Sequence, residues 1–219
     1  MKEVVIVGGA RTPIGSHGGA FRTLTAQHLA ALVFKEVIAR VGIDANLFDD
    51  VILGCILQQS DATNIGRVAA LMAGVPAHVP GWTVQRNCVS GMVALSSAYQ
   101  AIQAGDGEVF LCGGTESMST APYVVRGARW GLKLRHDTFI DVLWEGLTDP
   151  VCGQIMGYTA ENLAMMYAIS QDEQDKFAVL SHKKAFRATR MGRFRDEIVP
   201  VRVSKKVAGQ EVAYEDIVQ

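Results

Sequence analysis

The sequence has few cysteines, no long apolar run and almost no net charge, and each shortage excludes a class of protein. Its 219 residues include four cysteines, Cys55, Cys88, Cys112 and Cys152, and no Cys-x-x-Cys pair. This spacing indicates neither a zinc site nor a disulfide framework, so we expect no metal and a reduced, cytosolic setting. The formal charge of -1 provides no general attraction to nucleic acid or to an anionic membrane.

The N-terminal apolar run is short. Residues 4–7 (Val-Val-Ile-Val) are too few for a signal peptide or a membrane span, and we expect them to form a buried strand of a parallel sheet. Hydrophobic residues make up 49% of the chain, which is enough for a substantial core and argues against disorder.

The first half of the sequence alternates between strand and helix patterns. Short apolar or β-branched runs predict strands at 4–7, 51–57, 82–84 and 108–112. Apolar residues at helical spacing predict helices at 25–42, 65–73 and 91–102. This succession predicts an α/β fold with a mostly parallel sheet and right-handed crossovers.

The pattern changes after about Thr115. Residues 118–150 have no clean period, whereas helices are predicted at 159–168 and 171–190, the second opening on a capping box at Ser170. Alternation around 208–209 predicts a hairpin. We therefore expect a mainly helical, basic unit to follow the α/β core.

Glycines 8, 9, 15, 18 and 19 form a loop that invites comparison with a dinucleotide-binding turn. The segment Gly8-Gly9-Ala10-Arg11-Thr12-Pro13 is not G-x-G-x-x-G, and no acidic residue follows a second strand at the expected place. The sequence therefore argues against a nicotinamide or flavin cofactor bound in this way.

Cys88 lies between a predicted strand and a predicted helix. Trp82-Thr83-Val84 precedes it, and apolar residues at helical spacing begin at Gly91. Free N–H groups and the positive end of the helix dipole favour a thiolate at such a position. Ser90 and Gly91 leave room beside the sulfur, so Cys88 is a candidate nucleophile. The alternative is a small buried hydrophobe, as most unpaired cysteines are.

Six stretches, in order, resemble the thiolase family of acetyl-CoA acetyltransferases and 3-ketoacyl-CoA thiolases. They begin at Ala10 (ARTPIG), Asp49 (DDVILG), Asn64 (NIGR), Cys88 (CVSG), Gly113 (GGTESMS) and Met156 (MG, followed by TAEN). The resemblance implies a thiolase-like βαβαβα core at 1–117, lacking its last strand, and an incomplete inserted loop domain at 118–219. The second half of a full thiolase is absent from these 219 residues.

Two departures from the family pattern concern the site. Gln85 stands where the family commonly has Asn, and Ile155 stands where short-chain thiolases usually have His. The second departure puts a short-chain preference in doubt. The family's later Gly-His-Pro and Cys-x-Gly stretches do not occur in this sequence, so its acid–base histidine and second cysteine are missing here.

The resemblance implies that Cys88 forms an acyl thioester, with its own backbone N–H as an oxyanion donor. It also implies that Met156 lines the acyl pocket, although ordinary core packing is an equal alternative. The substrate is then a coenzyme A thioester, with no other cofactor, and the assembly a homodimer or homotetramer. Neither nucleic acid nor membrane is an expected partner. Basic residues at 182–206 either contact the phosphates of coenzyme A or, more simply, form a solvated face.

Two other hypotheses compete with an acyl-CoA C-acyltransferase. The chain is either a folded fragment that self-associates without catalysis, or one half of a split enzyme that pairs with a C-terminal chain. Under any of these, the 219 residues alone are expected not to turn over 3-ketoacyl-CoA, because they lack a recognisable base for α-proton abstraction. Glu116 and Arg67 are expected to be structural partners rather than catalytic groups.

Overall fold

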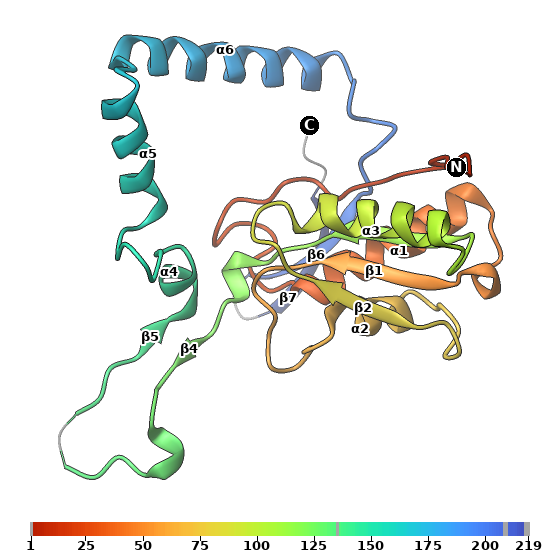
Figure 1. The fold of residues 1–219 in the computed structure, drawn as a ribbon, viewed down its shortest axis with the longest axis horizontal. Helices are drawn as coiled ribbons and strands as arrows, with labels where there is room; N and C mark the ends of the chain where they lie inside the picture. Colours follow the sequence, from red (N-terminus) through yellow and green to blue (C-terminus); the bar gives the residue numbers. More distant parts are fainter. Residues whose placement is uncertain (1, 135, 208–209, 217–219) are drawn as a thin grey trace. The chain divides into compact units, whose positions relative to one another are not determined.

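The computed structural model describes residues 2–134, 136–207 and 210–216 (Figure 1). The chain divides into two units. The first unit combines Met1–Thr120 with Asp196–Val218, and the second comprises Ala121–Arg195. The unit expected at 118–219 is thus divided, because its later residues contact the first unit. Arg11 donates its N–H to the Glu197 carbonyl, and Val199 donates to the Arg11 carbonyl, both at 2.8 Å.

A three-stranded parallel sheet lies at the centre of the first unit. Its strand order is β2 (Gly81–Val84), β1 (Asp50–Gly54) and β3 (Phe110–Gly114). The predicted α/β fold with a parallel sheet is therefore confirmed. Val51, Ile52 and Leu53 of the central strand are buried, as a strand covered on both faces requires.

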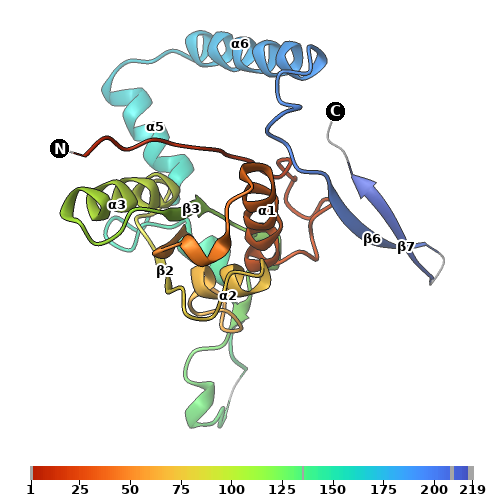
Figure 2. The same cartoon turned by 90° about the vertical axis from the view of Figure 1, so that its right-hand side faces the viewer.

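Helices cover both faces of this sheet (Figure 2). Helices α1 (Ala26–Val41) and α2 (Ile65–Met72) share one hydrophobic cluster with Val51 and Leu53. Helix α3 (Ser90–Ala104) packs Ala94 and Ala98 against Ile52, which points to the opposite face. Because neighbouring residues of a strand point to opposite faces, β1 packs against α1 and α2 on one face and against α3 on the other.

The strand expected at 4–7 does not form. Residues 2–10 belong to no strand, and the side chains of Val5, Ile6 and Val7 are 67%, 75% and 72% exposed. A strand requires a hydrogen-bonded neighbour, and among the described residues none pairs with this segment. The segment is fixed instead by Gln103 of α3, whose side chain exchanges two hydrogen bonds with the backbone of Lys2.

The last described strands form an antiparallel hairpin of β6 (Val201–Val207) and β7 (Gln210–Asp216). This agrees with the predicted hairpin, although its turn at 208–209 lies outside the described residues. Val201 and Val203 are buried with Phe21 in a small separate cluster.

The second unit consists of short strands and helices with little core of its own. Strands β4 (Tyr123–Val124) and β5 (Ile140–Asp141) pair antiparallel and lead into helices α4 (Val142–Gly146), α5 (Met156–Met166) and α6 (Gln171–Arg190). The capping box predicted at Ser170 and Glu173 opens α6. No residue of these three helices is buried, so an independent inserted domain stays a prediction.

Three short 3-10 helices complete the described structure: η1 (Ala45–Leu47), η2 (Met118–Thr120) and η3 (Ala128–Trp130). Within the described residues, no helix is both long and apolar enough to cross a membrane.

Candidate functional site

Cys88 lies on the turn that connects β2 to α3, as the sequence predicts. Strand β2 ends at Val84 and helix α3 begins at Ser90, so the turn is short. The Cys88 side chain is exposed, whereas Ser90 is buried. The interpretation of Cys88 as a small core residue therefore fails, and its thiol is accessible to a substrate.

The backbone of this turn has an unusual conformation. Asn87, the residue before Cys88, has a φ of 47°, in the left-handed region that side chains other than glycine rarely adopt. Asparagine tolerates this region better than most residues, which is the one signal of it in the sequence. The main-chain N–H groups of Val89 and Ser90 turn back to the carbonyls of Arg86 and Asn87, at 3.3 and 3.0 Å.

Three glycines allow the start of α3 to touch the sheet. A Cβ at Gly54 would lie 2.4 Å from the Ser90 carbonyl carbon and 2.5 Å from the Gly91 nitrogen. A Cβ at Gly114 would lie 3.1 Å from the Gly91 Cα. The carboxyl ends of β1 and β3 therefore contact the helix start through bare backbone, which fixes the place where the Cys88 turn ends.

The start of α3 offers hydrogen-bond donors beside Cys88. Its N-cap is Val89, whose side chain cannot accept a hydrogen bond from the first turn. The first N–H groups of a helix have no carbonyl partner inside the helix, and the helix dipole makes this end positive. The exposed thiol of Cys88 therefore lies close to the positive end of α3.

The other cysteines of the first unit differ from Cys88. Burial raises the pKa of the Cys55 thiol to about 12, and the negative charge of Glu116 adds to this shift. Burial also raises the pKa of Cys112 to about 12, with a further contribution from Asp50. Both thiols therefore stay protonated at neutral pH, and Cys88 is the exposed thiol of this unit.

Glu116 and Arg67 hold loops together, in keeping with the structural role expected for them. One carboxylate oxygen of Glu116 accepts the N–H groups of Ile56 and Leu57, at 3.0 and 3.2 Å. The Arg67 guanidinium donates to two carbonyls of the loop that leads into β2, those of Ala77 and Val79.

Asn64 ties α2 to the strand that leads to the site. Its side-chain oxygen accepts from the Arg67 N–H and caps the helix, while its amide donates to the Gly81 carbonyl at 2.9 Å. Gly66 approaches β2 so closely that a Cβ there would lie 2.2 Å from the Trp82 carbonyl oxygen.

Met156 belongs to the second unit, where it is the first residue of α5 and is 45% exposed. Its exposure does not fit the interpretation of ordinary core packing. A place for its side chain in an acyl pocket stays a prediction.

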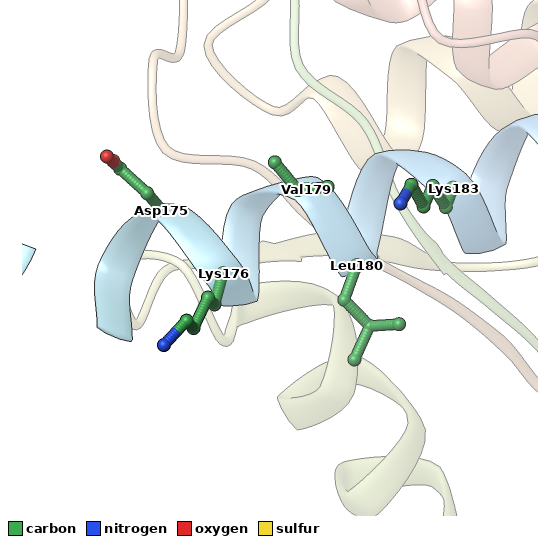
Figure 3. Close-up of a pocket in the computed structure, with 5 residues that line it drawn as sticks. All are labelled: Asp175, Lys176, Val179, Leu180 and Lys183. Atoms are coloured by element: carbon green, nitrogen blue, oxygen red, sulfur yellow. The ribbon is translucent and has the colours of Figure 1, made fainter. Parts of the chain in front are cut away.

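Basic residues of α6 line shallow hollows, and Lys184 and Arg187 line one of them. A shallow hollow lies along this helix, lined by Asp175, Lys176, Val179, Leu180 and Lys183, and their side chains point in several directions (Figure 3). All five residues come from one helix, which cannot enclose a ligand by itself. Arg190 lies 5.6 Å from the centre of the Phe186 ring, on the same helix.

Among the described residues, no group of three or more His, Cys, Asp or Glu side chains has the arrangement of a metal site. In the same part of the chain, no hydrogen bond joins Cys88 to a histidine; His28 is instead 2.6 Å from the Thr25 hydroxyl. The described residues thus place an exposed thiol, that of Cys88, just before the start of α3.

Comparison with known proteins relates this chain to the thiolases. The model described as "Thiolase, N-terminal domain" matches residues 4–219. An acetyl-CoA acetyltransferase of Syntrophomonas wolfei is 43% identical over 208 residues, which are 94% of this chain and 52% of that protein. An acetyl-CoA acetyltransferase of Pseudomonas aeruginosa is 44% identical over 207 residues, 94% of this chain and 53% of that protein.

Comparison with solved structures also finds thiolases. The acetyl-CoA acetyltransferase of Bacillus anthracis superposes with a TM-score of 0.89 at 44% identity, covering 96% of this chain and 53% of that one. Human mitochondrial 3-ketoacyl-CoA thiolase superposes with a TM-score of 0.87 at 37% identity, covering 95% and 52%. The chain thus spans about half the length of the curated relatives it matches.

Proposed function

This chain belongs to the thiolase family, and we propose that it carries the acyl-accepting cysteine of an acyl-CoA C-acyltransferase. The observation that supports this role most strongly is the exposed thiol of Cys88 at the start of α3. The proposed substrates are acetyl-CoA and a 3-ketoacyl-CoA, with coenzyme A as part of the substrate and no further cofactor.

In the first proposed step the Cys88 thiolate attacks the thioester carbonyl of an acyl-CoA. The carbonyl oxygen becomes an oxyanion, which the Cys88 backbone N–H and the start of α3 stabilise. The C–S bond to coenzyme A then breaks, the coenzyme A thiolate leaves and takes up a proton, and an acyl thioester remains on Cys88. Met156 is proposed to line the acyl pocket.

In the second proposed step the enolate carbon of another acetyl-CoA attacks the carbonyl of this thioester. The C–S bond to Cys88 then breaks, so the Cys88 thiolate is released and a 3-ketoacyl-CoA is formed. Removing the α-proton requires a general base, and such assistance is typically worth about 10²–10⁴-fold. Donors for the enolate oxygen contribute about another 10²–10³-fold. We propose that both groups come from residues outside this sequence, in the Gly-His-Pro and Cys-x-Gly stretches that the family resemblance implies.

We propose one half of a split enzyme as a second candidate. In that case the chain pairs with a separate C-terminal chain. A non-catalytic fragment that self-associates is the remaining alternative.

The test is to incubate the purified 219-residue chain with acetyl-CoA and to measure released coenzyme A by chromatography. The wild-type chain should release about one equivalent of coenzyme A and then stop, since acylation needs only the thiolate and nearby donors. Cys88→Ser should release far less, and Cys152→Ser should behave as wild type because its cysteine lies in the other unit.

Acetoacetyl-CoA cleavage, assayed in parallel, should be negligible. Sustained turnover by this chain alone would show that the base lies within these residues. Coenzyme A release that is equal in the wild type and in Cys88→Ser would remove the proposed nucleophile.

A further inference from the structure

The hydroxyl of Ser90 spans the turn that carries Cys88. The main-chain N–H of Arg86 donates to Ser90 Oγ at 2.8 Å, and the hydroxyl donates to the Asn87 carbonyl oxygen at 2.6 Å. The Ser90 N–H donates to that same carbonyl at 3.0 Å. One side chain therefore ties both residues before Cys88 to the first residue of α3.

Ser90 is also the buried anchor of an exposed turn. Residues 85–89 are all exposed, whereas Ser90 is 4% exposed and its backbone contacts Gly54 of β1. Packing against the sheet thus holds Ser90 in place, and the hydrogen bonds of its hydroxyl hold the turn in place relative to Ser90. Without these hydrogen bonds, the buried oxygen and the Arg86 N–H would both lose their partners.

The positive φ of Asn87 needs such support. A residue with a Cβ spends little time in the left-handed region unless surrounding contacts hold it there. Among the described residues, the Gln85 side chain also forms hydrogen bonds with Asn87, and these are long, at 3.4 and 3.5 Å. The shorter bonds of Ser90 are therefore the main restraint on the Asn87 conformation.

We propose that Ser90 is a positioning residue for acyl transfer to Cys88, an inference that rests on the proposed function. By holding Asn87 in the left-handed region, Ser90 directs the Cys88 sulfur and the N–H donors at the start of α3 toward one substrate carbonyl. Acylation requires the sulfur and the N–H donors to be placed correctly around the same carbonyl group, whereas alkylation by iodoacetamide requires only the sulfur. Comparing the rates of the two reactions therefore distinguishes a change in the positions of the reacting groups from a change in the accessibility of the Cys88 sulfur.

The test compares Ser90→Ala with Ser96→Ala, a control on the same helix. The Ser96 hydroxyl donates only to the Val93 carbonyl of its own helix, at 3.0 Å, and is exposed. In Ser90→Ala, acetylation of Cys88 by acetyl-CoA should fall about tenfold or more, since small misplacements of reacting groups have effects up to about 10²-fold. Alkylation of Cys88 should change little, and Ser96→Ala should change neither rate.

A second substitution tests the conformational reason. Asn87→Gly should restore most of the acetylation in the Ser90→Ala background, because glycine adopts a positive φ without the steric cost. Asn87→Val, made with Ser90 intact, should lose acetylation while keeping alkylation, because a β-branched residue is poorly tolerated at positive φ. Asn87→Gly and Asn87→Val, both made with Ser90 intact, test the conformational reason even if Ser90→Ala does not fold, because only the valine variant should lose acetylation.

Each result has a distinct meaning. Unchanged acetylation in a folded Ser90→Ala, or equal loss of acetylation and alkylation, overturns the positioning role while the proposed function stands. Equal acetylation in Asn87→Gly and Asn87→Val overturns it as well. Absence of acetylation on Cys88 in the wild-type chain overturns the proposed function itself.

Discussion

Iodoacetamide should distinguish the four cysteines in a defined order, with Cys88 labelled well before Cys55 and Cys112. The reagent reacts with the thiolate, so the labelling rate follows the ionised fraction and the exposure of each sulfur. At pH 8 an ordinary thiol with a pKa near 8.5 is about one-quarter ionised, whereas a pKa of about 12 leaves about one thiolate in 10⁴. Cys55 and Cys112 should therefore react about 10³-fold more slowly than an ordinary exposed thiol.

Peptide mapping by mass spectrometry after timed alkylation measures each site separately. Cys152 is exposed and lies in the second unit, so it serves as an internal control for the accessibility of a thiol. Circular dichroism must first show a folded chain, because unfolding would expose every thiol. Equal labelling of all four cysteines in the folded chain would refute the assignment of Cys88 as the accessible nucleophile.

The raised pKa of Cys55 also predicts a pH effect on stability. The folded chain holds this proton up to about pH 12, whereas the unfolded chain releases it near 8.5. The unfolded state therefore binds fewer protons in this range, and the free energy of unfolding falls as the pH rises through it. In Cys55→Ala this part of the decline should be absent, which chemical denaturation between pH 8 and about 10 measures; parallel declines in both proteins would contradict it.

Three further predictions concern the packing of Gly54 against α3, the hydrogen-bonded carboxylate of Asp49 and the oligomeric state of the chain. Gly54→Ala should lower stability by about 1–3 kcal/mol and slow acetylation of Cys88, because its Cβ would meet the Ser90–Gly91 backbone. Gly113→Ala, whose Cβ would meet only side chains at 3.6 Å or more, should lower the stability only slightly. Similar unfolding midpoints for Gly54→Ala and Gly113→Ala would refute the close contact at Gly54. Asp49 accepts the N–H groups of Glu108 and Val109, which lowers its pKa, so Asp49→Asn should be less stable at pH 7. Because protonation of Asp49 removes the stabilisation by its charged carboxylate, the stabilities of the wild type and Asp49→Asn should converge as the pH falls below about 4. A constant difference in stability across that range would argue against this role of Asp49. Light scattering at micromolar concentration should show dimers or larger species. Strand β2 is an edge strand, and an exposed apolar stripe runs along α3, including Val89, Met92, Leu95 and Tyr99. Met92→Glu should shift the chain toward monomer, whereas Met165→Glu on α5, with the same exposure, should not; monomeric wild type would count against the proposed pairing.

Local patterns predicted the parts of the fold that local interactions determine. The β2–Cys88–α3 turn follows from a short β-branched run, small residues and a helical period, all within about twenty residues of sequence. The capping box that opens α6 is equally local. These elements therefore lie where the sequence analysis placed them, within a few residues.

Features that depend on distant partners were not predictable in this way. The apolar run at 4–7 has the composition of a buried strand, yet its last three residues are exposed, and no described strand pairs with it. Likewise, residues 196–218 group with the first unit through contacts such as that of Arg11 with Glu197, which are far apart in sequence. Pairing of this kind leaves no periodic signal in either segment.

The details of the site were only partly visible in the sequence. Ser90 was interpreted as a small residue that leaves room beside the sulfur, whereas its hydroxyl bridges the turn. The requirement for glycine at position 54 arises from its contact with α3, which no spacing rule indicates. Asn87 carried a weak signal, since asparagine is enriched at positive φ.

The most direct test of the central claim is the location of the acyl group after the folded chain is incubated with acetyl-CoA. Peptide mapping under mildly acidic conditions, which preserve thioesters, should find one acetyl group on the peptide that contains Cys88 and none on those containing Cys55, Cys112 or Cys152. Hydroxylamine should remove it, as expected of a thioester. An unmodified Cys88 peptide, or acetyl groups spread over all four cysteines, would contradict the assignment of Cys88 as the acyl-accepting nucleophile.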